Sequence, residues 1–166
     1  MLSIIIQARM NSRRMPGKVL KNVFDKPLLS YLLERVLKVK EVEQVIIATS
    51  NEKKDDAIEK FCEYNKILFY RGSENNLLER FFFTAKKYNC NPIIRLTGDC
   101  PLMDPLVISD QIKFFFNNKL DYGYLGPSFP EGICSDIFKY DTLEKTYKNA
   151  TLSSDLEHIT PYMHKN

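Results

Sequence analysis

Basic side chains are concentrated in one short segment near the N-terminus. Arg9, Arg14 and Lys18 fall close together, with Ser12 among them and Pro16-Gly17 before the lysine. A triphosphate is bound by backbone N–H groups in a turn, by guanidinium groups that contact two oxygens at once, and by a mobile ammonium. Because the segment supplies all three kinds of donor, it is predicted to bind an anionic phosphate compound.

This segment differs from the phosphate-binding loop of the P-loop ATPases. It lacks the GxxxxGK[ST] pattern, and Val19 stands where that motif places a magnesium-binding hydroxyl. The alternative is a solvated basic loop that binds nothing. The position of the segment directly after a short apolar run, with Pro16-Gly17 to control the turn, favours phosphate binding over that alternative.

An acidic side chain follows another apolar run. Asp99 comes shortly after Ile93–Leu96, so it is expected at the carboxyl end of a buried strand. Magnesium binds one or two protein carboxylates together with phosphate oxygens, and Asp99 is predicted to be such a ligand. The alternative for an Asp after a Gly is a simple turn former. Asp104, which precedes Pro105, is instead predicted to cap the next helix.

Four runs rich in Ile and Val are each too short for a helix and are bounded by polar or turn residues. They are Leu2–Gln7, Gln44–Ala48, Ile67–Tyr70 and Pro92–Leu96, and segments with helical spacing of apolar residues separate them. This alternation predicts an α/β Rossmann-like domain, with a mostly parallel central sheet and helices on both faces. Ligands of such folds bind beyond the carboxyl ends of the strands, where the basic segment and Asp99 are placed.

The pattern changes after residue 120. Asp121–Leu125 and Ile133–Tyr140 are predicted strands, and a helix is predicted from Thr142 to Lys148. The Gly- and Pro-rich stretch Gly126–Gly132 between the strands is typical of a loop. Residues 121–140 are interpreted as a subdomain that covers the substrate.

Length and composition favour a single domain of 166 residues that needs neither disulfides nor a metal cluster. The four cysteines form no CxxC pair and the two histidines show no zinc-site spacing, which favours a reduced cytoplasmic protein. No apolar run approaches the roughly 18 residues of a membrane span. The net charge of +3 hides an excess in residues 1–24, which hold Lys and Arg but no Asp or Glu. So local an excess favours a small phosphate compound over nucleic acid.

The basic segment also resembles the opening of a known family. Residues 5–20, IIQARMNSRRMPGKVL, are similar to the start of the spore-coat polysaccharide cytidylyltransferase-like proteins, relatives of the CMP-Kdo and CMP-sialate synthetases. Similar segments follow in order over nearly the whole chain: ATS at 48–50, FYRGSE at 69–74, RLTGDCPLMDP at 95–105 and EHITPY at 157–162. The resemblance implies a nucleotidyltransferase fold, magnesium as cofactor, and transfer of CMP from CTP to a sugar or sugar acid with release of pyrophosphate.

The resemblance also implies the catalytic residues. Arg9, Arg14 and Lys18 would hold the triphosphate and offset its charge, and Asp99 would hold magnesium. Arg13 stands where many relatives carry a small hydroxyl residue, so it receives no role.

Further residues would contact the nucleotide. Gln7 and Ala8, at the end of the first strand, would lie beside the base and ribose, and Ser12 would add a phosphate contact. Arg71-Gly72-Ser73 resembles a segment that lines the nucleotide pocket. The alternative for these three residues is an ordinary turn in which Ser73 caps the next helix.

Gly132–Phe138 departs from the family pattern. Relatives commonly show an acidic pair in Gly-Leu-Asp-Val-Glu-Val-Phe, whereas here Cys134 replaces the first acid and Asp136 is shorter than the second. Asp136 is the second candidate metal ligand, and Cys134 is expected either to alter activity or to pack in the core. His158 is interpreted as a hydrogen-bonded structural histidine, with contact to the acceptor as the alternative.

Two other functions stay open. A nucleotide-sugar-dependent glycosyltransferase shares the Rossmann-like domain but normally binds its metal through Asp-x-Asp, which this sequence lacks. A non-catalytic nucleotide-binding protein would keep the basic segment after losing its chemistry. Relatives continue well beyond the EHITPY segment at 157–162, so the chain is expected to be truncated and to turn over poorly alone. A homodimer is expected for the full-length protein.

Overall fold

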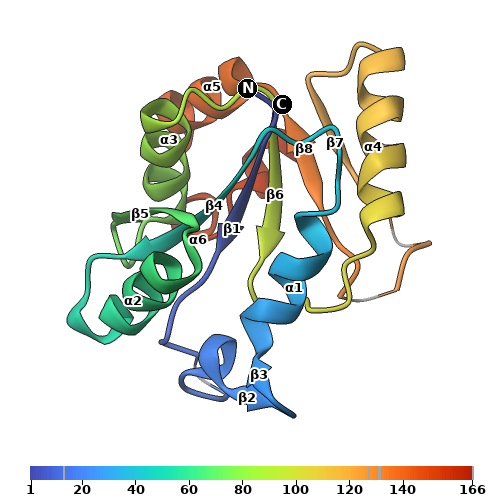
Figure 1. Cartoon of the computed structure of the whole chain (residues 1–166). Coiled ribbons are helices and arrows are strands. Elements are labelled where there is room, and N and C mark those ends of the chain that lie inside the picture. The colour runs from blue at the N-terminus through green and yellow to red at the C-terminus, as the bar shows by residue number, and fades with distance from the viewer. Residues whose placement is uncertain (13, 127, 131, 166) are drawn as a thin grey trace.

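The computed structural model describes residues 1–12, 14–126, 128–130 and 132–165, which form a central sheet between two layers of helices (Figure 1). The strands of this sheet are β1 (Ser3–Gln7), β4 (Gln44–Ser50), β5 (Leu68–Gly72), β6 (Ile93–Thr97), β7 (Tyr122–Tyr124) and β8 (Asp136–Phe138). They are arranged in the order β5-β4-β1-β6-β8-β7. β1, β4, β5 and β6 run parallel, whereas β8 is antiparallel to both of its neighbours.

Alternate residues of β1 point to opposite faces of the sheet and enter different cores. Ile4 and Ile6 belong to the core on one face, Ile5 to the core on the other, and all three are fully buried. The first core is covered by α1 (Leu28–Val36), α2 (Asp56–Asn65) and α4 (Pro105–Asn117). The second is covered by α3 (Leu77–Lys87), α5 (Tyr140–Asn149), α6 (Ser153–Glu157) and α7 (Thr160–Lys165). The predicted Rossmann-like fold, with a mostly parallel sheet and helices on both faces, is confirmed.

The central strands run further than their apolar runs predict. The run that contains Ala48 predicts a strand ending there, but β4 continues through Thr49 and Ser50, which are fully buried. These polar residues end the apolar pattern while their backbone still pairs with β5 at Arg71 and Gly72. The sheet therefore extends to the edge where ligands of such folds bind.

Residues 121–140 extend the same sheet through β7 and β8. β8 pairs with β6 in the register Arg95↔Asp136 and with β7 in the register Tyr122↔Phe138. Both strands are shorter than predicted, and α5 begins at Tyr140, two residues before the predicted start. The covering of a substrate by this segment stays a prediction, and residues 127 and 131 of its loop lie outside the described residues.

One cap prediction is confirmed and another is wrong. Asp104 accepts a hydrogen bond from a backbone N–H of the first turn of α4 at 2.8 Å, and Pro105 occupies the first helical position. At α3 the N-cap is Asn76, whose side chain accepts from the N–H of Glu79 at 2.9 Å. Ser73 lies earlier, and its Oγ accepts from the N–H of Asn76 at 3.1 Å. The hydroxyl of Ser73 therefore shapes the turn before the helix and does not cap it.

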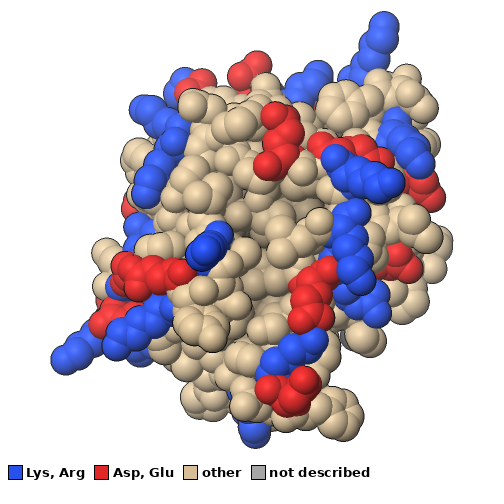
Figure 2. Space-filling view, in the orientation of Figure 1, with Lys and Arg blue, Asp and Glu red and all other residues tan. Residues whose placement is uncertain are grey.

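The surface carries charges of both signs. Lys and Arg side chains are interspersed with Asp and Glu side chains over the face shown in Figure 2. In the part of the chain that the structure describes, no helix combines the length and the hydropathy that a membrane crossing requires.

Candidate active site

The candidate site lies where the strand order of the sheet reverses. From β1 the chain continues to β4 and β5 on one side, and only then returns to β6 on the other side. Ligands of open α/β sheets bind at such a switch point, beyond the carboxyl ends of the strands. β1 and β6 are paired up to Gln7 and Thr97, so the loops that follow these residues start side by side.

Gly98 brings the loop after β6 against the end of β1. Its N–H donates to the backbone oxygen of Gln7 at 2.8 Å. A Cβ at this position would lie 3.1 Å from that oxygen and 3.1 Å from the Cβ of Ala8. Because glycine has no Cβ, the two strand ends can approach this closely, and Asp99 is held beside the segment that follows β1.

The first loop, defined as residues 8–12 and 14–18, is folded back on itself. The N–H of Gly17 donates to the oxygen of Met10 at 2.8 Å, and Gly17 has a φ of 73°, a left-handed conformation that glycine adopts without strain. The N–H of Met15 donates to Ser12 Oγ at 3.3 Å. The turn delivers Lys18 as the first residue of η1 (Lys18–Leu20).

Lys18 and Asp99 form an ion pair between the two loops. Lys18 Nζ donates to Asp99 Oδ2, and the two side chains are 25% and 35% exposed. Burial raises the pKa of Asp99, but hydrogen bonding and charge from Lys18, the backbone N–H of Asp99 and the side chain of Thr97 outweigh it. The pKa of Asp99 is thereby lowered below its ordinary value, so the group is a carboxylate at neutral pH.

A cavity of about 170 Å³ opens between the first loop and the loop after β6. It is lined by Gln7, Ala8, Arg9, Asn11, Ser12, Lys18, Val19, Thr97, Gly98 and Asp99. The structure thus brings together most of the residues predicted from the sequence. Arg14 is exposed and is not part of this lining, and Arg13 lies outside the described residues.

Arg71-Gly72-Ser73 line a second cavity, of about 570 Å³, beyond the ends of β4 and β5. The guanidinium of Arg71 already has protein partners there. It forms ion pairs with Glu59 and, at 2.7 Å, with Asp56, and it donates to the backbone oxygen of Ser50 at 2.9 Å. Contact of this segment with the nucleotide stays a prediction, and Arg71 would have to exchange partners to make it.

Both carboxylate oxygens of Asp136 are engaged by side chains. Oδ2 accepts from Arg95 Nη1 at 2.8 Å, and Oδ1 accepts from the hydroxyl of Tyr122 at 2.8 Å. Arg95 Nε also donates to Gln7 Oε1 at 3.2 Å, which links Asp136 to the lining of the first cavity. Among the described residues, no group of three or more His, Cys, Asp or Glu is placed to hold a metal ion. Metal binding by Asp136 stays a prediction that would require it to release Arg95 and Tyr122.

Two further predictions do not fit the structure. Cys134 is exposed, so the alternative that it packs in the core is wrong. His158 is exposed, and its imidazole has no hydrogen-bond partner in the described part of the chain, so the structural role expected for it is not found. His164 is the histidine that is held in place, because its Nε2 lies 2.9 Å from the hydroxyl of Tyr122.

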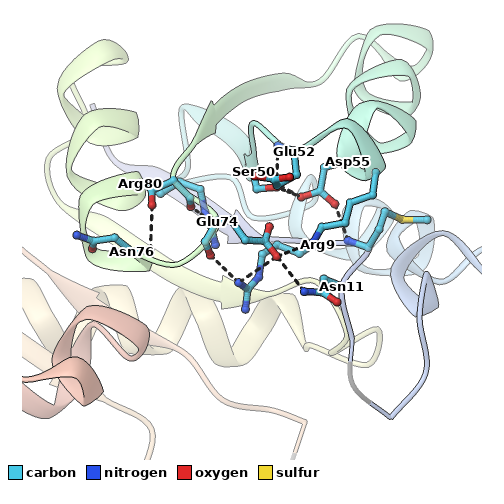
Figure 3. A network of polar contacts seen from close by, with 11 residues as sticks. Arg9, Asn11, Ser50, Glu52, Asp55, Glu74, Asn76 and Arg80 are labelled. Atoms are coloured by element: carbon cyan, nitrogen blue, oxygen red, sulfur yellow. Dashed lines mark hydrogen bonds and ion pairs between the residues drawn. The ribbon is translucent and has the colours of Figure 1, made fainter.

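Two acidic residues that the sequence pattern did not single out contact the first loop (Figure 3). Asp55 Oδ1 accepts from the N–H of Met10 at 2.8 Å, and Glu74 Oε1 accepts from Asn11 Nδ2 at 3.0 Å. Asp55 lies in a run of charged residues that is typical of an exposed helix start, yet it is fully buried. Glu74 is the last residue of the FYRGSE segment at 69–74, and the similarity of that segment to the family is the feature of the sequence that could have identified it.

The strand order and this site define a Rossmann-like α/β domain that carries a basic loop and a carboxylate at its switch point. The chain belongs to the cytidylyltransferase family, whose family model matches residues 3–166. The resemblance noted in the sequence is confirmed by this match and by the relatives.

Two curated relatives align with almost the whole chain. An uncharacterized protein of Methanocaldococcus jannaschii is 39% identical over 162 residues, which cover 98% of this chain and 66% of that protein. The spore coat polysaccharide biosynthesis protein SpsF of Bacillus subtilis is 36% identical over 164 residues, which cover 96% of this chain and 68% of that protein. The chain therefore spans about two thirds of the length of these relatives.

Solved structures show the same fold. A cytidylyltransferase from Leptospira borgpetersenii superposes with a TM-score of 0.94 at 36% identity, over 99% of this chain and 71% of that one. A CMP:2-keto-3-deoxy-manno-octonic acid synthetase complexed with CTP superposes with a TM-score of 0.75 at 18% identity, over 100% of this chain and 86% of that one. The second likeness concerns the fold alone.

Proposed function

We propose that the protein transfers CMP from CTP to a sugar or sugar acid, with release of pyrophosphate, in the biosynthesis of a surface polysaccharide or glycoconjugate. The observation that carries the proposal is the cavity at the β1–β6 switch point, where Lys18 and Asp99 face each other in a member of the cytidylyltransferase family. Its similarity to a spore coat polysaccharide biosynthesis protein supports the polysaccharide setting.

The first loop supplies the triphosphate site of the proposed reaction. Arg9 and Lys18 line the cavity from the same loop, so both cations can contact a chain of phosphates laid along it. Gln7 and Ala8, at the end of β1, border the cavity where the base and ribose would follow. Arg14 is close in sequence, and its exposed side chain would have to turn inward to take part.

The reaction itself requires no covalent intermediate with the protein. A hydroxyl of the acceptor attacks the α-phosphorus of CTP in line. Its oxygen bonds to phosphorus, its proton is released to solvent, and the bond from the α-phosphorus to the bridging oxygen of the β-phosphate breaks. The electron pair of the broken bond leaves on pyrophosphate. Arg9 and Lys18 offset the negative charge of the transferring and leaving groups, so catalysis consists mainly of positioning and electrostatic stabilisation.

Magnesium is the proposed cofactor, and the residues present fit it. The carboxylate of Asp99 is ionised and partly exposed in the cavity lining, and a Mg²⁺ ion accepts one protein carboxylate when phosphate oxygens and water complete its shell. When bound, Mg²⁺ would supply charge neutralisation on the phosphates. For the two ligands to bind together, Lys18 must exchange Asp99 for a phosphate.

Two measurements test the proposed function. Calorimetric titration with CTP reports binding, and release of pyrophosphate in the presence of Mg²⁺ and a panel of sugars and sugar acids reports turnover. Both signals are expected. Binding without pyrophosphate release for any acceptor would favour a non-catalytic nucleotide-binding protein. If the protein transferred the sugar of a nucleotide sugar to an acceptor and released no pyrophosphate from CTP, the result would favour a glycosyltransferase.

A further inference from the structure

Three consecutive residues of the first loop contact two acidic residues from other parts of the chain. The guanidinium of Arg9 donates to the backbone oxygen of Glu74, and the side-chain amide of Asn11 donates to the Glu74 carboxylate. Between them, the backbone N–H of Met10 donates to the Asp55 carboxylate (Figure 3). The acids come from the segments that follow β4 and β5. The loop predicted to bind phosphate is thus anchored from one side, opposite to the side on which Lys18 meets Asp99.

Asp55 fixes the backbone of the loop. It is fully buried at the end of η2 (Lys53–Asp55), and its Oδ1 accepts from the N–H of Met10 at 2.8 Å. Its Oδ2 accepts from the N–H of Ser50 at 3.1 Å and from the hydroxyl of Ser50. One buried carboxylate therefore joins the loop to the last residue of β4.

Glu74 fixes the side chains of the loop. Its Oε1 accepts from Asn11 Nδ2 and from Lys54 Nζ, both at 3.0 Å, and its backbone oxygen accepts from Arg9 Nη1 at 2.7 Å. Burial raises the pKa of Glu74, but the nearby hydroxyl of Ser50, the hydrogen bonds from Lys54 and Asn11 and the charge of Arg9 outweigh it. The pKa is thereby held at about 2. Glu74 is therefore a fixed negative charge beside Arg9, with its side chain only 11% exposed.

The turn that carries Glu74 is held by hydrogen bonds to the preceding residue, Ser73. Arg80 on α3 is 1% exposed, and its Nη1 donates to the backbone oxygen of Ser73 at 2.5 Å. The N–H of Asn76, two residues after Glu74, donates to Ser73 Oγ at 3.1 Å and closes the turn around Glu74. Burial lowers the pKa of Arg80 to about 10, which leaves the group charged at neutral pH. Glu74 thus projects from a turn that is held through Ser73, the residue before it.

This arrangement leaves one edge of Arg9 available to a ligand. Nη1 is occupied by the backbone oxygen of Glu74, whereas Nε and Nη2 have no partner among the described residues, and Arg9 lines the first cavity. We infer that Glu74 is a positioning residue for triphosphate binding, which holds Arg9 and Asn11 so that the free edge of the Arg9 guanidinium faces the phosphates. Asp55 supports the same loop through the Met10 backbone. The inference rests on the proposed function, because it needs the first loop to bind phosphate.

The sign of a substitution effect separates positioning from plain electrostatics. Removing the negative charge of Glu74 would by itself strengthen the binding of an anion nearby, since like charges repel. Loss of a positioning contact would weaken it. Alanine keeps the backbone oxygen that accepts from Arg9, but it removes the carboxylate that holds Asn11 and lies 3.9 Å from Arg9 Nη1. We therefore expect Glu74→Ala to weaken the binding of CTP and of inorganic tripolyphosphate by about tenfold, although the substitution makes the site more positive.

A double-mutant cycle with Arg9 tests the route of the effect. Calorimetric titration is carried out on wild type, Glu74→Ala, Arg9→Ala and the double variant, with CTP and with tripolyphosphate as ligands. Glu74→Ala is expected to cost about tenfold in affinity in the wild-type background and little in the Arg9→Ala background. Glu74→Gln, which keeps the shape and one acceptor, should weaken binding less and provides the cycle should the alanine variant not fold.

The control is Glu34→Ala. Glu34 lies on α1, forms an ion pair with Lys26 at 2.6 Å, and does not line the first cavity. It should bind both ligands as wild type does. Unchanged or tighter binding in Glu74→Ala would overturn the inference while leaving the proposed function intact. An equal loss in both backgrounds would also overturn it, since the effect of Glu74 would then not depend on Arg9. If wild type bound neither ligand, the proposed function would fail together with the inference.

Discussion

Lys18 and Asp99 reach each other from the loops after β1 and β6, and their ion pair joins the two sides of the candidate active site. The ammonium proposed to bind phosphate and the carboxylate proposed to bind magnesium therefore share one contact. A bound triphosphate with its magnesium ion would replace this single contact by two, one between Lys18 and a phosphate and one between Asp99 and the metal. The pair thus holds both groups in place, and it sets the signs of the first two predictions.

Lys18→Ala should impair both binding and turnover. Removing the ammonium takes away a cation from the leaving-group side, and loss of one such stabilising group typically lowers kcat by about 10²–10³. The measurement is magnesium-dependent pyrophosphate release together with CTP titration. Lys21→Ala is the matched control, because Lys21 is an exposed basic residue nearby that does not line the cavity. Equal kinetics of the two variants would mean that the basic loop is merely solvated.

Asp99→Asn should separate metal dependence from nucleotide binding. The amide is nearly isosteric with the carboxylate but lacks its charge, so the fold should persist while magnesium-dependent activity is lost. In metal-free buffer the variant should bind CTP more tightly than wild type, because Lys18 is released from its ion pair and a repelling charge is gone. Thermal unfolding and calorimetry with and without Mg²⁺ provide the readouts. Full activity of the variant would show that Asp99 is only a turn residue. Asp110→Asn, at an exposed position of α4, serves as the control.

CTP should stabilise the protein more than ATP, GTP or UTP. The expectation comes from membership of the cytidylyltransferase family and from the cavity that begins at Gln7 and Ala8. A ligand that binds only the folded state raises the free energy of unfolding, and with it the unfolding temperature, by more at a given concentration when its Kd is lower. Thermal shifts at equal concentrations compare the four nucleotides. Equal shifts would remove the preference for cytosine without affecting the fold.

The sequence predicts those parts of the fold and site that depend on local pattern. The apolar runs gave the parallel strands, and strand ends identified Lys18 and Asp99, because ligands of this fold class bind at that edge. Local pattern does not predict hydrogen bonds between residues that are far apart in the sequence. Arg9 meets Glu74 across 65 residues, and Met10 meets Asp55 across 45.

The same limit applies to Asp136 and Arg71, whose contacts with metal and nucleotide stay predictions, and to Cys134, for which the expected core position is wrong. Asp136 and Arg71 are charged residues at strand ends, as ligand-binding residues often are, but the neighbouring strands and helices provide each of them with partners. Cys134 replaces an acid in the family pattern, and an apolar thiol suggests a core position, yet the backbone places it at the surface. Residue type alone does not distinguish a side chain held by its own fold from one that faces a ligand.

Glu74 should make stability depend on pH in acid. Its pKa in the folded protein is about 2, below the ordinary value of 4.5, so the folded state holds its proton less tightly than the unfolded state. The sign follows from proton linkage: the stabilisation is fully present above about pH 4.5 and is lost as the pH falls through about 2. For a side chain that is 11% exposed, the depressed pKa corresponds to a contribution on the order of 3 kcal/mol.

Urea unfolding at about pH 5 and about pH 2.5 measures this contribution in wild type and in Glu74→Gln. The variant lacks the titrating group, so it should be less stable than wild type at the higher pH, and the difference should shrink at the lower pH. The remaining carboxylates titrate in both proteins, which is why the difference between them isolates Glu74. A gap in unfolding free energy that stays constant over this range would show that Glu74 contributes through shape and not through its charge, and would remove its ion pairs with Lys54 and Arg9 as a source of stability.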